Sequence, residues 1–336
     1  MERNINPKYE TVTFECEVIT PMFLGNAIKG QPELRVPPIK AALRFWWRAL
    51  HPSISVAELR KREMQLFGGS YGAQDEMKSN RSKVLISIPY SDVDFEFNSL
   101  KANYLVDEKR KINFNTGEEY IKSRNINLIK YITYGIGDDD ENESGYLAPG
   151  STFTLALSFN NVAENEKQHI IKALYAIGLI GGLGAKARNG FGRFSINQIS
   201  PAPTFAFSLN DILIPVSNTL SEYIVISNQV NRIACINNPF NNWYDAIVEL
   251  ATLYKRAKSN VDFEHKPSVR QYITPQIKKS KFTIERFSKS YFLTVIKTNN
   301  QYKGYIIFFP IKPTKFDENY TTANKIFIDS LNELNS

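Results

Sequence analysis

Two hydrophobic periods alternate along the first 200 residues, and their order restricts the fold more than any other feature of this sequence. Strand patterns, with apolar residues at every second position, occupy residues 11–19, 83–88 and 151–159, and residues 190–196 lead into another strand. Helix patterns, with apolar residues three or four positions apart, occupy residues 39–50, 56–67 and 164–180. Pro89 is expected to close the second strand. With residues 90–150 set aside, the order is β-α-β-β-α-β, the ferredoxin-like arrangement.

Residues 90–150 lack a clear period and contain an acidic run at 138–143, so they are expected to form a long insertion between the second and third strands. The prolines of residues 200–203 indicate a linker, because proline resists both helix and central strand.

Beyond the linker the pattern predicts a ferredoxin-like order that lacks its last strand. The expected elements are a strand at 223–227, a helix at 240–257, strands at 291–297 and 305–309, and a helix at about 323–334. The chain is therefore predicted to be an α+β protein with two ferredoxin-like (RRM-like) domains in tandem. Their expected bounds are 1–200, with the insertion at about 90–150, and 201–336, which agrees with about 150 residues per domain.

The charge balance makes a polyanion the first partner to consider. The sequence has 41 Lys and Arg against 34 Asp and Glu, a formal net charge of +7. No long uncharged apolar run and no signal-peptide layout occurs, so a cytoplasmic protein without a membrane partner is expected.

The cysteines and histidines predict neither a disulfide scaffold nor a metal site. Cys16 and Cys235 lie far apart, and His51, His169 and His265 share no zinc-ligand spacing with them. We expect no metal and no cofactor, and a buried, inert thiol at Cys16.

The helix at 39–50 has one apolar stripe and one basic side. Ile39, Leu43, Trp46 and Leu50 form the stripe, and Trp46 is expected in the core. The opposite side carries Lys40, Arg44, Trp47 and Arg48. Spaced cations match the charges of a phosphate backbone, and an exposed indole can stack on an unpaired base. The alternative is a solvated charged face with no ligand and with Trp47 partly buried beside it.

A second basic element is the glycine-rich stretch at 181–193. It follows a helix and precedes a strand, which disfavours dinucleotide binding, and no Gly-Lys-Ser/Thr sequence makes it a P-loop. Its exposed amides, with Lys186, Arg188 and Arg193, are expected to hold a polyanion without reading its sequence. The alternative is a glycine C-cap followed by a tight turn.

No catalytic set emerges from the sequence. His51, at the end of the basic helix, has the chemistry of a general base for RNA cleavage. The alternative is a partner of the helix dipole.

Several motifs together resemble the RAMP superfamily of CRISPR systems, and more narrowly the family of subunit one of the type III-B Cmr effector complex. They are Thr20-Pro21-Met22-Phe23-Leu24-Gly25, Glu33-Leu34-Arg35, the run at 39–50 with Phe45-Trp46-Trp47-Arg48, Leu66-Phe67-Gly68-Gly69, Arg81-Ser82-Lys83-Val84 and the glycine-rich stretch.

The resemblance implies a non-catalytic RNA-binding subunit that lies near the 3′ end of the CRISPR RNA and helps to position guide and target RNA. Its partners would be CRISPR RNA, target RNA and other RAMP subunits of the Cmr complex. The predicted RNA-binding residues are Lys40, Arg44, Trp47, Arg48, Lys186, Arg188, Asn189, Phe191 and Arg193, with Trp47 or Phe191 as the stacking surface. The alternatives are a metal-independent CRISPR-RNA-processing endoribonuclease of the same superfamily that uses His51, and a structural adaptor whose basic face binds protein.

Overall fold

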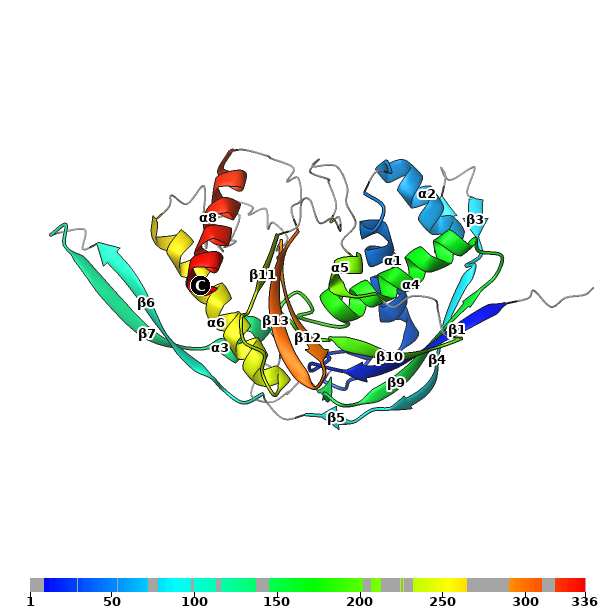
Figure 1. The fold of residues 1–336 in the computed structure, drawn as a ribbon, viewed down its shortest axis with the longest axis horizontal. Coiled ribbons are helices and arrows are strands. Elements are labelled where there is room, and N and C mark those ends of the chain that lie inside the picture. The colour runs from blue at the N-terminus through cyan, green and yellow to red at the C-terminus, as the bar shows by residue number, and fades with distance from the viewer. Residues whose placement is uncertain are drawn as a thin grey trace, which may run out of the picture.

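The computed structural model describes most of the chain, with gaps (Figure 1). The described residues are 9–28, 30–52, 54–71, 78–97, 100–112, 116–136, 145–201, 207–212, 224, 226, 232–264, 290–309 and 318–335.

Four strands, two before and two after the expected insertion, form the first sheet. They are β1 (Glu10–Val18), β4 (Val84–Asp92), β9 (Thr152–Phe159) and β10 (Phe194–Ser200). The sheet order is β10-β1-β9-β4, with every neighbouring pair antiparallel. β1 and β4 therefore flank β9, and β9 and β10 flank β1, which makes two split β-α-β connections. The four strands predicted in residues 1–200 all occur, in the predicted order along the chain.

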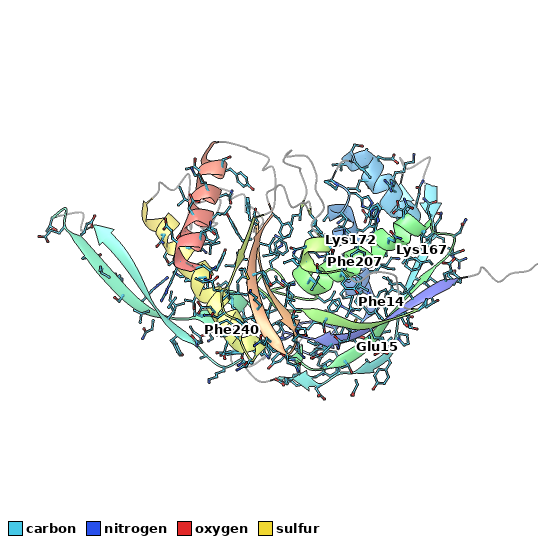
Figure 2. The ribbon with its side chains drawn as sticks, viewed as in Figure 1. Phe14, Glu15, Lys167, Lys172, Phe207 and Phe240 are labelled. Atoms are coloured by element: carbon cyan, nitrogen blue, oxygen red, sulfur yellow. The ribbon has the colours of Figure 1, made fainter. Side chains whose placement is uncertain are left out.

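Helices cover one face of this sheet (Figure 1). They are α1 (Val36–Ala49), α2 (Val56–Phe67) and α4 (Glu164–Ala176), which continues into the π-helical turn η2 (Ile177–Gly181). Along β1, Phe14 is fully buried on the helix side and Glu15 is exposed on the other side, as Figure 2 shows. This alternation is the one that the period of two predicts.

Two boundaries differ from the predictions. α1 begins at Val36 instead of 39, with prolines in its first turn, where a missing N–H leaves no intrahelical bond unmade. β4 does not stop at Pro89 but continues to Asp92 through a register shift between Ser87 and Tyr90. β4 is an edge strand, and an edge tolerates a proline at such an irregularity.

The expected insertion contains its own elements. They are β5 (Phe95–Glu96), β6 (Tyr104–Ile112), β7 (Glu119–Asn127), α3 (Leu128–Thr133) and β8 (Tyr146–Leu147). The β6–β7 hairpin extends away from the rest of the molecule, at the left of Figure 1. The acidic run at 138–143 lies outside the described residues. A short hairpin of β2 (Gly69–Tyr71) and β3 (Lys78–Asn80) follows α2.

The second sheet has three strands in the order β11-β13-β12. These strands are β11 (Arg232–Cys235), β12 (Tyr291–Thr298) and β13 (Gln301–Phe308), accompanied by α6 (Trp243–Glu264) and α8 (Glu318–Asn335). The short helix α5 (Leu209–Ile212) lies beside α4 (Figure 1). The strand expected at 223–227 is wrong for its two described residues, Ile224 and Ile226, which are buried but not in a strand. The rest of that range lies outside the described residues, and β11 takes the first position of the sheet.

Both faces of β12 are covered, so its first five residues, 291–295, are all buried. Leu293 packs in a cluster with α6, whereas Phe292 contacts Trp46 of α1, with 5.9 Å between ring centroids. The second sheet thus lies between its own helices and those of the first sheet. Both hydrophobic clusters contain residues from either side of position 200. The mixed α+β class is confirmed, and the domain boundary at 200 stays a prediction.

Among the described residues, none of the helices combines the length and the apolar character needed to cross a bilayer.

Candidate RNA interface

The arginines of α1 converge on one buried carboxylate of α2. Glu63 Oε1 accepts a hydrogen bond from Arg44 Nε at 2.5 Å and another from Arg48 Nη1 at 2.7 Å. The Glu63 side chain is 7% exposed, whereas both arginine side chains are 35% exposed. Arg44 and Arg48 are one helical turn apart, which aims both guanidinium groups at the same point of α2. They are thus neither a solvated charge run nor fully free cations.

A pocket of about 540 Å³ opens between α1 and α2 at this cluster. Its lining residues are Arg44, Arg48, Val56, Leu59, Arg60, Glu63, Met64 and Gly69. Three guanidinium groups therefore face one carboxylate, which leaves two positive charges uncompensated within the lining. A concave site with a positive excess suits a phosphate group, for which the arginine fork is well shaped.

The sequence analysis missed Arg60 and Glu63, although both belong to a helix that it predicted. They are three residues apart on α2 and therefore on one face. A search of the α2 polar face for a partner of the α1 cations would have found Glu63.

Lys40 lies one turn before Arg44 on α1. Its Nζ donates to Ser82 Oγ at 3.3 Å, next to the start of β4. Burial, and then the positive charge of Arg44, lower the pKa of Lys40.

The stacking role predicted for Trp47 is wrong, because its side chain has 0% exposed surface. The indole packs against His51, with ring centroids 4.3 Å apart, and against Phe67 of α2. Its Nε1 donates to Glu166 Oε2 of α4 at 3.4 Å. Trp46 is buried as predicted, but on the side of α1 that faces β12. α1 contacts α2, α4 and β12 in addition to the first sheet, so more of its surface is buried than the single apolar stripe in its sequence predicts.

The glycine-rich loop does not present a row of exposed amides, which corrects the prediction. Many of its N–H groups donate within the chain: Gly182 to Ile177, Leu183 to Gly192, Ala185 to Phe23, Asn189 to Lys186, Gly190 to Ala187, Gly192 to Pro21, and Arg193 to Thr20 Oγ1. The loop is therefore hydrogen-bonded to residues 20–23, which follow β1.

Two of the glycines are required by the packing of this loop. Gly184 and Gly192 have φ of +86° and +72°, which L side chains rarely adopt. A Cβ on Gly192 would overlap the backbone of Leu183, and a Cβ on Gly184 would overlap that of Phe23. The structural alternative, a tight turn, accounts for the glycines.

Of the loop's cations, Lys186 and Arg188 are half-buried. The Arg188 guanidinium lies 5.1 Å from the ring centroid of Phe292, and the Arg188 carbonyl accepts from Leu293 N. The Asn189 amide donates to the carbonyl of Ile132 in α3. Arg188 therefore adjoins β12, whereas Arg44 and Arg48 adjoin α2, and within the described part of the chain no recorded contact joins Arg188 to either of them.

RNA contact by Arg193 or Phe191 is wrong for this structure, since both side chains have 0% exposed surface. Arg193 Nη2 donates to the carbonyls of Ala187 and Leu293 at 2.8 and 2.7 Å. Burial without a carboxylate lowers the pKa of Arg193 to about 9. Arg193 thus fastens the loop to β12, and Phe191 packs edge-on against Phe23.

His51 is buried, with its Nδ1 at 2.7 Å from the Trp47 carbonyl oxygen. Burial is also the largest cause that lowers its pKa. The His51 ring centroid lies 4.7 Å from that of His169 on α4. The sequence predicted no metal site because the histidines share no zinc-ligand spacing with the cysteines, but the fold brings His51 and His169 together with Glu166. At Cys16 the buried, inert thiol is confirmed, and burial raises its pKa.

Two curated proteins of Pyrococcus furiosus are similar to this chain. The CRISPR system Cmr subunit Cmr1-1 is 28% identical over 196 residues, which cover 56% of this chain and 48% of that protein. Subunit Cmr1-2 is 26% identical over 200 residues, covering 57% of this chain and 97% of that protein. The aligned part spans about half the length of the first relative.

Solved structures share the fold over nearly the whole chain. The crystal structure of Cmr1 from Pyrococcus furiosus in its apo form has a TM-score of 0.53 and 20% identity, covering 96% of each chain. A chain of the type III-B Cmr-beta complex bound to cognate target RNA and AMPPnP has a TM-score of 0.54 and 11% identity, covering 98% of this chain and all of that one. The RAMP superfamily model matches residues 15–195, more than half of the 336 residues, and the chain therefore belongs to the RAMP superfamily.

Proposed function

We propose that this protein is a Cmr1-type, non-catalytic subunit of a type III-B Cmr effector complex and that it binds RNA through the α1–α2 pocket. Its similarity to two proteins named as Cmr1 subunits supports the assembly. The fold that it shares with a chain of Cmr-beta bound to cognate target RNA supports RNA as the ligand.

The observation that carries RNA binding is the excess of guanidinium over carboxylate in the pocket. Arg60 is exposed and lines the pocket without contributing to the ion pairs of Glu63. Arg44 and Arg48 each use one nitrogen for Glu63 in the bonds recorded among the described residues. The remaining N–H groups suit phosphate oxygens, and such contacts bind RNA without reading its sequence. Lys40 and Lys186 are further phosphate contacts in this proposal.

The partners in this proposal are CRISPR RNA near its 3′ end, target RNA and neighbouring RAMP subunits, as the resemblance implies. Its architecture is two ferredoxin-like units in tandem. The strand order β11-β13-β12, with chain positions 1-3-2, is the ferredoxin-like order without its fourth strand.

The experiment measures the affinity of the full chain for labelled single-stranded repeat RNA by fluorescence anisotropy, between about 50 and about 200 mM salt. Arg60→Gln removes one pocket cation and leaves Glu63 paired. Each lost phosphate contact should make the slope of log affinity against log salt shallower by ~0.7. The matched control is Lys122→Gln on the exposed β7, which makes the same charge change far from the pocket in sequence. An equal slope change in both variants would contradict a pocket-specific contact.

A second variant tests the paired arginines without stranding a buried charge. Arg44→Gln/Arg48→Gln/Glu63→Gln neutralises the whole cluster, because removing only the arginines would leave Glu63 buried and unpaired. RNA affinity should fall while circular dichroism stays native. If the variant kept its RNA affinity but no longer bound another Cmr subunit that the wild type binds, the structural adaptor would be favoured.

The same purified protein should leave repeat RNA intact in the absence of metal. The burial of His51 and its bond to the Trp47 carbonyl oppose a role as general base. Specific cleavage that disappears in His51→Ala would establish the endoribonuclease instead.

A further inference from the structure

Three ligand-type side chains meet between the end of α1 and the first half of α4. His51 follows α1, and Glu166 and His169 lie three residues apart on one face of α4. One potential ligand atom of each lies within 4.8 Å of the others. The proposed RNA pocket uses none of the three.

The hydrogen bond of His51 determines which of its two ring nitrogens can act as a metal ligand. Its Nδ1 lies 2.7 Å from the Trp47 carbonyl oxygen, which can only accept a hydrogen bond. Nδ1 therefore carries the proton, and Nε2 carries the lone pair. A ring whose second nitrogen donates to a backbone carbonyl is the usual arrangement of a metal-binding histidine.

His169 and Glu166 supply the other donors. His169 Nδ1 is buried and has no hydrogen-bond partner among the described residues. Glu166 Oε1 accepts from Arg62 Nη2, whereas among the described residues Oε2 is recorded only with Trp47 Nε1, at 3.4 Å. Oε2 is thus the carboxylate oxygen that is less engaged.

Burial lowers the pKa of both His51 and His169 below the ordinary value for histidine. A lowered pKa favours the neutral ring, the form in which an imidazole binds a metal. Packing of two neutral rings explains their contact, but it leaves His169 Nδ1 unsatisfied.

We propose that His51 Nε2, His169 Nδ1 and Glu166 Oε2 bind one divalent transition-metal ion, Zn²⁺, which ties the end of α1 to α4. Two imidazoles and a carboxylate are an established zinc donor set, with water in the fourth position. Bonds of about 2.0–2.1 Å in a tetrahedron place ligand atoms ~3.3 Å apart. The ligand atoms lie within 4.8 Å of one another, so they would approach by up to about 1.5 Å when the ion binds.

Arg62 provides a specific check, because its guanidinium competes for the same carboxylate. A cation next to a bound Zn²⁺ repels it, so Arg62→Gln should tighten Zn²⁺ binding, by about tenfold for charges some 5 Å apart. If Arg62 and Glu166 form only a structural ion pair, this substitution adds no metal affinity.

The experiment titrates ZnCl₂ into the metal-stripped full chain, free of any affinity tag, by calorimetry. It also records the visible absorption of the Co²⁺-loaded protein. One ion per chain is expected, with the intense bands of tetrahedral Co²⁺. His169→Ala and Glu166→Gln should each weaken the affinity by at least ~10-fold, whereas His265→Ala, which removes the remaining histidine, should leave it unchanged.

The proposal is overturned if wild type binds no more metal than the His51→Ala/His169→Ala variant, or if His265→Ala removes the binding. Glu166→Gln keeps the size of the side chain and is therefore expected to fold. If the histidine variants do not fold, the zinc affinity of Glu166→Gln still tests the site. The Co²⁺ spectrum of the wild type needs no variant at all, and octahedral, weak bands would also refute the site.

Discussion

At the residue scale, Arg44 and Arg48 show how one charged side chain serves two purposes. Each pairs with the buried Glu63 and keeps about a third of its side chain exposed at a pocket. A buried carboxylate is strongly destabilising without a partner, so these arginines contribute to folding even if no RNA is bound. Charge reversal at either position would therefore change stability and binding together.

Trp46 and Trp47 are adjacent, and both are core residues. Trp46→Ala and Trp47→Ala should each lower the free energy of unfolding by roughly 3–5 kcal/mol, as truncations of fully buried aromatics do. Urea unfolding followed by circular dichroism measures both. Trp243→Ala, at a half-buried indole on α6, is the control and should cost less. A Trp47→Ala variant as stable as wild type would show that its side chain is not packed as described.

At the element scale, the glycine-rich loop connects the two sheets through contacts with both of them. Its backbone is bonded to the end of β1 on one side, and Arg188 and Asn189 adjoin β12 on the other. The buried Arg193 bonds to the loop and to β12 at once. Gly182, Gly184 and Gly192 permit this close backbone approach. The loop's role in holding the fold is separate from any contact that Lys186 makes with RNA.

Gly192 and Gly150 form a matched pair that separates steric overlap from backbone strain. Both have positive φ, but nothing lies within 4 Å of a Cβ on Gly150, whereas a Cβ on Gly192 would overlap Leu183. Gly150→Ala should cost about 1 kcal/mol and Gly192→Ala more than ~3 kcal/mol. Thermal unfolding of both variants measures the difference. Equal losses would mean that strain alone, and not close approach, requires glycine at 192.

At the scale of the whole molecule, the two sheets share their cores. Trp46 of α1 packs on Phe292 and on Phe309, which follows β13. Lys297 Nζ also pairs with Glu17 Oε1 of β1 at 2.6 Å. The hydrophobic clusters therefore do not separate at the linker that the prolines suggest.

A fragment of residues 1–201 tests whether the first sheet folds alone. It would expose the Trp46 face of α1 and leave Arg193 without Leu293. We expect it to bind a hydrophobic dye and to unfold less cooperatively and at lower temperature than the full chain. Calorimetry of both proteins checks this. A fragment with the melting temperature of the full chain would establish 1–200 as an independent domain.

The sequence predicted those features that depend on local periodicity. The strands near 11–19 and 151–159 and the helices near 39–50 and 164–180 all occur close to their expected bounds, since each has one apolar face. The four-strand order followed from these elements. In the candidate site, Lys40, Arg44 and Arg48 were found because they share one side of a helix.

Only the tertiary structure decided which of the other surfaces of these helices and loops are covered by neighbouring elements. Trp47, Phe191 and Arg193 read as exposed because a one-dimensional pattern cannot register a second or third packing partner. The same limit hid Glu63 beside the α1 arginines and His169 beside His51, 118 positions apart in the chain. Periodicity thus determined the elements, whereas contacts between distant residues determined which charges are paired, which are buried, and where a ligand can bind.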